Sequence, residues 1–555
     1  MRSVLAVGVA LAAGLAGAAV AGSPPTAIDP ARLSGHIRVL GSDAFEGRGP
    51  ATPGEDRTLT YIEGQFKALG LAPAGDGGGW TQAVPLRRFE TPGPIAVSFA
   101  VGETARPLTE LDDIVVHTEL PVDHVSVKAA PLLFVGYGVS APERGWDDFK
   151  GQDVKGRILV VLINDPDGEM DPKDPLYGRF DGKAMTLYGR WTYKYAEAAR
   201  RGALGVLIVH ETGPAAYGWN TVKNSNSNAQ FDIIRPHPED LHPLVEGWIQ
   251  HQTAVDLFKA AGLDYEAEKA RARTTGFTPV ALDGATFSAD YAVASATTVS
   301  HNVIGRIPGT KRPGEAVLFG AHWDHLGVGL PDARGDTIYN GAVDNASGVA
   351  GVIELARRFA GGPPPERSVY FIGFTAEEKG LLGSEYYAAH PVTPLATTAA
   401  LLNLDVMNVS GAARDLSTRG KGDADLDLLV ARFVAAQPGR RYTHDAHLEE
   451  GSFYRADHFS LAKAGVPAVT LTAGLDLVNG GVAAGEAAHR DYVAHRYHQP
   501  ADEWRADWDL SGAAADLEVY YALGRHLADT HDWPGWPATS EFKAAREATA
   551  ADRKP

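Results

Sequence analysis

The sequence predicts an α/β protein in which a mostly parallel, doubly wound sheet carries a smaller, β-rich inserted domain. Three apolar runs of strand length, at residues 316–320, 368–374 and 399–404, alternate with helical patterns such as residues 347–359. Uninterrupted apolar strands of this kind are typical of sheets covered by helices on both faces. The chain has 555 residues, which is too long for one simple core and predicts at least two domains.

The N-terminus has the layout of a secretory signal peptide. Arg2 precedes a run of apolar and small residues at 4–19, and Ala19-Val20-Ala21 offers small residues at a cleavage site. The run is too short and too rich in alanine and glycine to span a bilayer comfortably. We therefore expect residues 1–21 to be removed on export to the periplasm or the medium, with no membrane span afterwards.

The rest of the chain divides into four predicted segments. Residues 22–130 form the first part of the catalytic domain, with a helical pattern at 30–70 that glycine and proline interrupt. Residues 131–290 form the insert, and residues 291–535 form the main part of the catalytic domain. Residues 536–555 are left as a C-terminal tail.

Short strands and one helix define the predicted insert. Apolar runs at residues 132–135, 158–163 and 205–209 are bounded by turn residues and indicate strands. A helix-period segment at residues 191–201 lies between the last two runs.

Composition and charge exclude several classes of function. The chain has no cysteine, which excludes cysteine nucleophiles and cysteine zinc clusters, so that any metal site must use His, Asp and Glu. The net charge of −18 argues against nucleic acid as a partner, because phosphates require a basic surface.

Metal-ligand residue types follow the predicted strands. Ligands of such sheets bind beyond the carboxyl ends of the strands, so these positions are where chemistry is expected. The residues found there or in the connecting loops are His322, Asp344, Glu377, Glu378 and Asp405, and a later histidine is His498.

This set of residue types suits a pair of zinc ions. One carboxylate that bridges both ions, with one histidine and one further carboxylate on each, leaves each ion an open position. A bridging hydroxide would then balance the four positive charges. In the Glu377-Glu378 pair, one carboxylate can bind metal while its neighbour acts as a base. Asp324, two residues after His322, can accept the other N–H of the imidazole.

The motifs resemble the M28 family of co-catalytic zinc exopeptidases. They are His322-Trp323-Asp324, the Asp344-x-x-Ser-Gly segment, the Glu377-Glu378 pair, Asp405 within residues 403–407, and Tyr497-His498. Segments 45–49 and 455–459 are also similar to that family, and residues 131–290 resemble a protease-associated (PA) domain insert. The resemblance implies a sheet of the zinc-exopeptidase type.

The resemblance also implies a role for each site residue. Two zinc ions per chain are expected, although other divalent transition metals suit the same ligands. One ion takes His322, Asp344 and Asp405, and the other takes Asp344, Glu378 and His498. Glu377 is the expected base that activates the bridging hydroxide, and Tyr497 is expected to stabilise the oxyanion.

The resulting functional prediction is an exopeptidase acting on peptides or small proteins, with an aminopeptidase as the first interpretation. A carboxypeptidase of the glutamate carboxypeptidase type is the alternative, and it would need cations placed for a terminal carboxylate. A receptor-like homologue without catalysis is disfavoured, because all the ligands and the base are present. The sequence does not place the groups that would bind either terminus, and it leaves the oligomeric state open.

Overall fold

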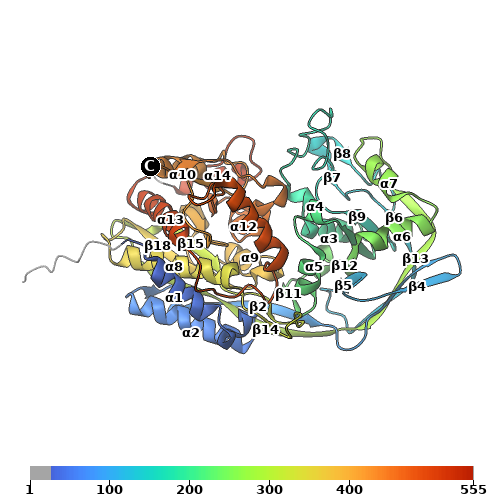
Figure 1. The fold of residues 1–555 in the computed structure, drawn as a ribbon, viewed down its shortest axis with the longest axis horizontal. Helices are drawn as coiled ribbons and strands as arrows, with labels where there is room; N and C mark the ends of the chain where they lie inside the picture. The colour runs from blue at the N-terminus through green and yellow to red at the C-terminus, as the bar shows by residue number, and fades with distance from the viewer. Residues whose placement is uncertain (1–26, 554–555) are drawn as a thin grey trace, which may run out of the picture.

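The computed structural model describes residues 27–553, so the predicted signal peptide lies outside the described residues. These residues form two units, one around a ten-stranded sheet and the other around an eight-stranded sheet (Figure 1). Within the described part of the chain, no helix combines the length and the apolar character needed to cross a bilayer.

The ten-stranded sheet has the order β11-β2-β14-β18-β15-β19-β22-β20-β21, and β1 pairs with β14. Its strands are β1 (Ala72–Pro73), β2 (Thr81–Glu90), β11 (Gln230–Ile233), β14 (Ala294–Ile307), β15 (Arg312–His322), β18 (Arg367–Phe374), β19 (Thr398–Asn403), β20 (Asp415–Thr418), β21 (Arg441–Tyr442) and β22 (Ala468–Thr472). The four central strands, β18, β15, β19 and β22, are parallel as predicted. Strands β14, β2 and β11 add an antiparallel flank, so the sheet as a whole is mixed.

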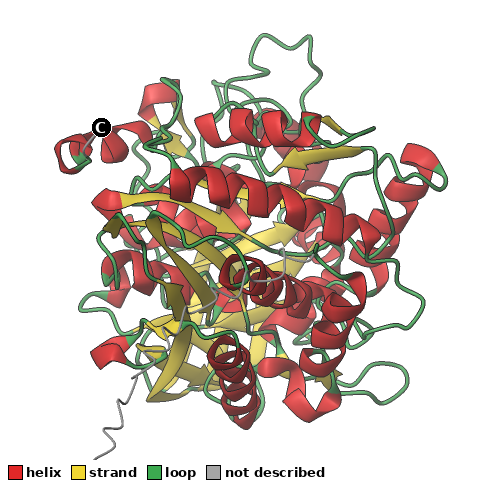
Figure 2. Cartoon of the chain, turned by 90° about the vertical axis from the view of Figure 1, so that its left-hand side faces the viewer, coloured by secondary structure: helices red, strands yellow, loops and turns green. Residues whose placement is uncertain are grey.

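Helices cover both faces of this sheet, as Figure 2 shows. The helices of this unit are α1 (Pro30–Leu40), α2 (Pro53–Ala68), α8 (Ser347–Ala360), α9 (Leu382–Ala389), α10 (Asp425–Ala435), α11 (His458–Lys463), α12 (Gly481–His495), α13 (Ser511–Asp529) and α14 (Lys543–Ala548). Alternate residues of β15 enter different cores: Phe319 packs in one cluster and Leu318 in the other. Burial on both faces explains why the strand is apolar at every position from residue 316 to residue 321.

The second unit contains the eight-stranded sheet, in the order β4-β3-β13-β6-β9-β10-β12-β5. Its strands are β3 (Ala96–Val101), β4 (Thr104–Leu108), β5 (Ile114–His117), β6 (His124–Phe134), β9 (Ile158–Leu162), β10 (Gly205–His210), β12 (Val245–Gln250) and β13 (Val280–Ala292). Its helices are α3 (Trp191–Arg200), α4 (Thr212–Ala215), α5 (Trp219–Asn226), α6 (His251–Ala260) and α7 (Tyr265–Ala272). Two small hairpins lie outside both large sheets: β7 (Ser140–Ala141) pairs with β8 (Trp146–Asp147) in the second unit, and β16 (Gly327–Val328) pairs with β17 (Ile338–Tyr339) in the larger unit.

The second unit begins earlier than the sequence predicts. The predicted boundary at residue 131 falls inside β6, whereas the eight-stranded sheet takes its strands from Ala96 onward. Strands β3 and β4 are only partly buried, so they lack the continuous apolar runs that the prediction relied on. The assignment of residues 131–290 to one domain also differs from the structure at β11, which pairs with β2 in the larger sheet.

The segment predicted as a C-terminal tail is packed on the larger unit. It carries α14, and the Arg546 side chain is buried and donates hydrogen bonds to the carbonyl oxygens of Thr398 and Pro534. The apolar contacts of Phe542 with Phe459 and Phe453 hold the same segment in place.

Candidate metal centre

Side chains of metal-ligand type lie at or just beyond the carboxyl ends of three neighbouring parallel strands of the larger sheet. His322 is the last residue of β15, and Asp405 lies two residues beyond β19. Glu377 and Glu378 begin the short 3-10 helix η7 (Glu377–Lys379), which follows β18. Because β15 lies between β18 and β19, the carboxyl ends of these strands adjoin and their side chains meet.

The Asp344 carboxylate lies between two histidines. Its Oδ1 atom is 3.3 Å from His322 Nε2, and its Oδ2 atom is 3.5 Å from His498 Nε2. Asp405 Oδ1 lies 3.6 Å from the first imidazole, and Glu378 Oε2 lies 3.0 Å from the second. The structure thus brings the five predicted ligands together as two groups of three that share Asp344.

The side chains present fit a pair of zinc ions. His498 Nε2 is buried and has no hydrogen-bond partner among the described residues, although it points at two carboxylates. Burial alone would raise the pKa of Asp344, but His322 and His498 hold it well below its ordinary value. Neutral imidazole and carboxylate oxygen are the donor types that zinc takes when no thiolate is available.

Asp324 is placed differently from the expectation. His322 Nδ1 lies 3.2 Å from the backbone oxygen of Asp324 and 3.8 Å from its carboxylate, so the carbonyl is the nearer acceptor. The carboxylate is turned toward η7, where it accepts the backbone N–H groups of Glu377 at 3.1 Å and Glu378 at 3.4 Å. Burial raises the pKa of Asp324 to about 7. Asp324 therefore positions the glutamate pair and orients His322 through its main chain.

Arg48 fixes the two loops that hold His322 and Asp344. The side chain is fully buried, and its guanidinium donates hydrogen bonds to the carbonyl oxygens of Leu40, Trp323, Asn340 and Gly341. Arg48 lies in the segment 45–49 that sequence analysis singled out only for its resemblance to a family motif.

Asp502 supports the Asp344 loop from the other side. Its carboxylate accepts the backbone N–H of Val343 at 3.1 Å and that of Asp344 at 3.0 Å. Sequence analysis gave this residue no role, and its position shortly after Tyr497-His498 was the one available signal.

Two arginines and a further histidine also contact the site residues, and sequence analysis gave none of them a role. Arg419 Nη1 donates to Asp405 Oδ2 at 2.7 Å, and Arg455 Nη2 donates to the Tyr497 hydroxyl at 3.0 Å. His325 Nδ1 lies 2.6 Å from Glu378 Oε1. Arg455 starts the motif at 455–459, whereas nothing around Arg419 marks it in the sequence.

Helix α5 of the second unit contacts the predicted metal ligand His498 through hydrogen bonds. Ser225 Oγ lies 2.7 Å from His498 Nδ1, and Asn224 Nδ2 donates to the His498 carbonyl oxygen at 2.8 Å. Lys379, the last residue of η7, donates to the Ser225 carbonyl oxygen at 3.2 Å. An N–H on His498 Nδ1 that donates to Ser225 leaves the Nε2 lone pair facing Asp344 and Glu378.

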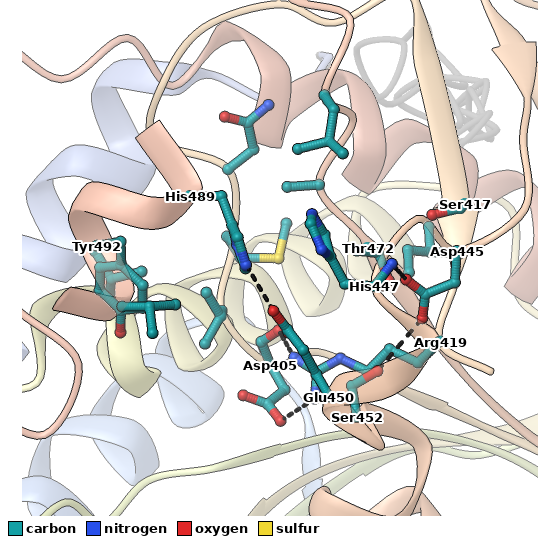
Figure 3. A pocket seen from close by; sticks show the side chains of 18 of the residues that line it. Asp405, Ser417, Arg419, Asp445, His447, Glu450, Ser452, Thr472, His489 and Tyr492 are labelled. Atoms are coloured by element: carbon teal, nitrogen blue, oxygen red, sulfur yellow. Dashed lines mark hydrogen bonds and ion pairs between the residues drawn. The ribbon is translucent and has the colours of Figure 1, made fainter. Parts of the chain in front are cut away.

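Two cavities meet beside the predicted ligands. One, of about 250 Å³, includes Asp405, Arg419 and Glu450 in its wall, and Figure 3 shows the Arg419–Asp405 pair there. The other, of about 420 Å³, is lined largely by the second unit. Their walls share Glu377, Glu378, Arg455 and Tyr497. A molecule that entered both cavities would contact these residues.

The site gathers two imidazoles around a shared carboxylate beyond the strand ends of an α/β sheet, which is the arrangement that the motifs led us to expect. The model of peptidase family M28 matches residues 302–522. Those residues therefore match the M28 peptidase family, in agreement with the resemblance seen in the motifs.

Individual relatives match over shorter segments. A probable zinc metalloprotease of Pyrenophora teres f. teres is 38% identical over 110 residues, which are 20% of this chain and 23% of the relative. Aminopeptidase YwaD of Bacillus subtilis is 33% identical over 113 residues, 20% of this chain and 22% of the relative. The solved aminopeptidase from Aneurinibacillus sp. strain AM-1 has a TM-score of 0.52 and 20% identity, covering 92% of this chain and 96% of that one. This last likeness shows the fold.

Proposed function

We propose that this chain is an exported exopeptidase that uses two zinc ions to release residues from the amino ends of peptides. The observation that carries the proposal is the Asp344 carboxylate facing His322 on one side and His498 on the other, at 3.3 and 3.5 Å. The aminopeptidase named among the relatives supports the direction of cleavage. The N-terminal segment with its Ala19-Val20-Ala21 site supports export.

Glu377 acts as the general base and then the general acid. When bound, the ions supply Lewis acidity at the scissile carbonyl and lower the pKa of the attacking water. Burial raises the pKa of Glu377 well above its ordinary value, so the carboxylate readily takes a proton. Glu377 accepts the proton of the water and then hands it to the leaving amine.

Tyr497 stabilises the oxyanion. Arg455 donates to the Tyr497 hydroxyl oxygen, which leaves the O–H of Tyr497 free to donate to the substrate carbonyl oxygen. A donor fixed in advance at this point stabilises the developing charge without reorganisation.

The smaller cavity suits a free α-amine. Its two arginines nearest the ligands are engaged: Arg419 holds Asp405 through both terminal nitrogens, and Arg455 holds Tyr497 and the Glu450 carbonyl oxygen. Neither guanidinium therefore has both of its terminal nitrogens available to bind the terminal carboxylate of a substrate. The Glu450 carboxylate in the same wall provides negative charge for an ammonium group.

A carboxypeptidase is the second candidate, and Arg190 favours it. Arg190 precedes α3 and lines the larger cavity, where Glu377 and Tyr497 also lie. Burial lowers the pKa of Arg190 to about 10, and its Nε atom is buried without a hydrogen-bond partner. A guanidinium of this kind beside the catalytic base is suited to the terminal carboxylate of a substrate.

Three peptide substrates distinguish these functions: one with a free amine and a blocked carboxyl end, one with the reverse, and one blocked at both ends. The proposal predicts cleavage of the first alone, abolished by a chelator. Cleavage of the second alone, with a KM raised by Arg190→Met, would establish the carboxypeptidase. Cleavage of the doubly blocked peptide would overturn both, and zinc-loaded protein without any hydrolysis would support a receptor-like role.

A further inference from the structure

A second cluster of histidines and carboxylates lies in the second unit. His117 ends β5 and Glu246 lies in β12, and the two residues are directly opposite in the antiparallel ladder. Opposed residues of such a ladder project their side chains on the same face. Glu119 follows β5 and His242 precedes β12, so that four ligand-type side chains converge. We call these four residues the β5–β12 cluster.

The β5–β12 cluster is buried and its donor atoms are close together. Glu246 is 0% exposed, Glu119 8% and His117 9%. His242 Nδ1 lies 2.9 Å from Glu246 Oε1 and 3.5 Å from Glu119 Oε2. His117 Nε2 lies 3.2 Å from Glu246 Oε2 and 3.8 Å from Glu119 Oε1. Neighbouring ligands of tetrahedral zinc lie roughly 3.3–3.5 Å apart, given bonds of about 2.0–2.2 Å.

Asp232 orients one histidine of the β5–β12 cluster. His242 Nε2 lies 3.4 Å from Asp232 Oδ2, and Arg235 Nε holds the Asp232 carboxylate at 2.9 Å. Histidines that bind metals commonly donate their second N–H to a carboxylate in this way. With Nε2–H directed at Asp232, the Nδ1 lone pair of His242 faces the two glutamates.

Three buried polar atoms at the β5–β12 cluster make no hydrogen bond among the described residues. They are Glu246 Oε2, His117 Nδ1 and the hydroxyl of Tyr195, whose ring packs edge-on against His117. The neighbour of Glu246 Oε2 is the His117 imidazole, with Nε2 at 3.2 Å, and a fully buried carboxylate oxygen without a hydrogen bond is costly unless a cation binds it. The cluster also lines the larger cavity, which gives an ion a route of entry.

We propose that the β5–β12 cluster binds a third divalent transition cation, with zinc as the best fit to its ligands His117, Glu119, His242 and Glu246. Two carboxylates balance the charge of the ion, and four protein ligands close its coordination sphere. A closed sphere of this kind is typical of structural zinc rather than catalytic zinc. The ion joins β5 to β12 at the edge of the eight-stranded sheet.

The test separates this site from the catalytic centre by mutation. The double variant His322→Ala/His498→Ala of the full chain removes one imidazole from each of the two catalytic groups. After equilibration with zinc and desalting, mass spectrometry of the metal content should find about three zinc per chain in the wild type and about one in the double variant. Adding Glu246→Gln should remove the remaining zinc.

A matched control uses Glu266, which belongs to an exposed histidine–glutamate group with Glu211 and His251. Glu266→Gln in the double variant should leave one zinc in place. The proposal is overturned if the double variant holds no zinc, or if Glu246→Gln changes its zinc content no more than Glu266→Gln does. If Glu246→Gln does not fold, the metal-free double variant is melted with and without zinc. The expected result is a higher unfolding temperature with zinc, and no shift would overturn the proposal.

Discussion

Ser225 offers the sharpest test of how the second unit serves the metal centre. Ser225→Ala removes the hydroxyl that lies 2.7 Å from His498 Nδ1. His498 is only 7% exposed, so the ring loses its partner where water has little access. The hydrogen bond from Asn224 to the His498 carbonyl oxygen is retained, which keeps the main chain in place.

The size of the effect follows from one buried hydrogen bond. Such a bond contributes about 1 kcal/mol net, and a partner left unsatisfied costs about 1–3 kcal/mol. About 1.4 kcal/mol corresponds to a tenfold change in an equilibrium constant. We therefore expect zinc at the group of His498 and Glu378 to bind about 10-fold more weakly, within the roughly 10–100-fold range for residues that orient a metal ligand.

The assay is competition for zinc with a chromophoric chelator, together with the hydrolysis rate as a function of free zinc. Ser227→Ala is the matched control, because the Ser227 hydroxyl bonds only the Asn224 carbonyl oxygen nearby. Ser225→Ala should need about ten times more free zinc for half-maximal rate. Equal zinc affinities in the two variants would refute the view that Ser225 orients His498.

Three further predictions concern the base, the buried arginine and the metal. Glu377→Gln should keep its zinc and lose about 10²–10⁴-fold in kcat, as a lost general base does, and near-normal hydrolysis would exclude Glu377 from that role. Arg48→Met leaves four buried carbonyl oxygens without their donor and should lower the free energy of unfolding by about 3 kcal/mol or more. The control Arg57→Met removes an exposed ion pair and should change that free energy by less than about 1 kcal/mol. Chemical denaturation measures both values. A chelator should abolish hydrolysis and zinc should restore it. Zinc affinity should fall as the pH drops below about 9, because the carboxylates of Glu378 and Asp344 outweigh the effect of burial and raise the pKa of His498 to about 9 in the metal-free protein, and the imidazole must lose that proton to bind. Metal titration at several pH values measures this, and a pH-independent affinity would contradict it.

Much of the larger unit could be predicted from local patterns. The predicted runs at residues 316–320 and 368–374 lie within β15 and β18, and the run at 399–404 extends one residue beyond β19. These runs are recognisable because strands buried on both faces are largely apolar. The ligand types were found because they follow those strands at the edge where the sheet binds its ligands.

The limits of the second unit could not be predicted in the same way. Strands β3 and β4 have mixed exposure and lack a distinctive run, so the boundary was placed inside β6. Strand β11 is short and belongs to the other sheet, and only its pairing with β2 reveals this.

By itself the sequence determined which residue types are available and near which strand ends they lie. It thereby limited the possible metal ligands to His, Asp and Glu, and its resemblance to a known family predicted the Glu377-Glu378 pair as base and ligand. Only the tertiary structure decided which partners those side chains have. Ser225 and His498 are 273 positions apart in the chain, and Arg48 bonds carbonyl groups up to 293 positions away. Such contacts depend on how distant segments of the chain pack, and a local pattern of residues carries no information about that packing.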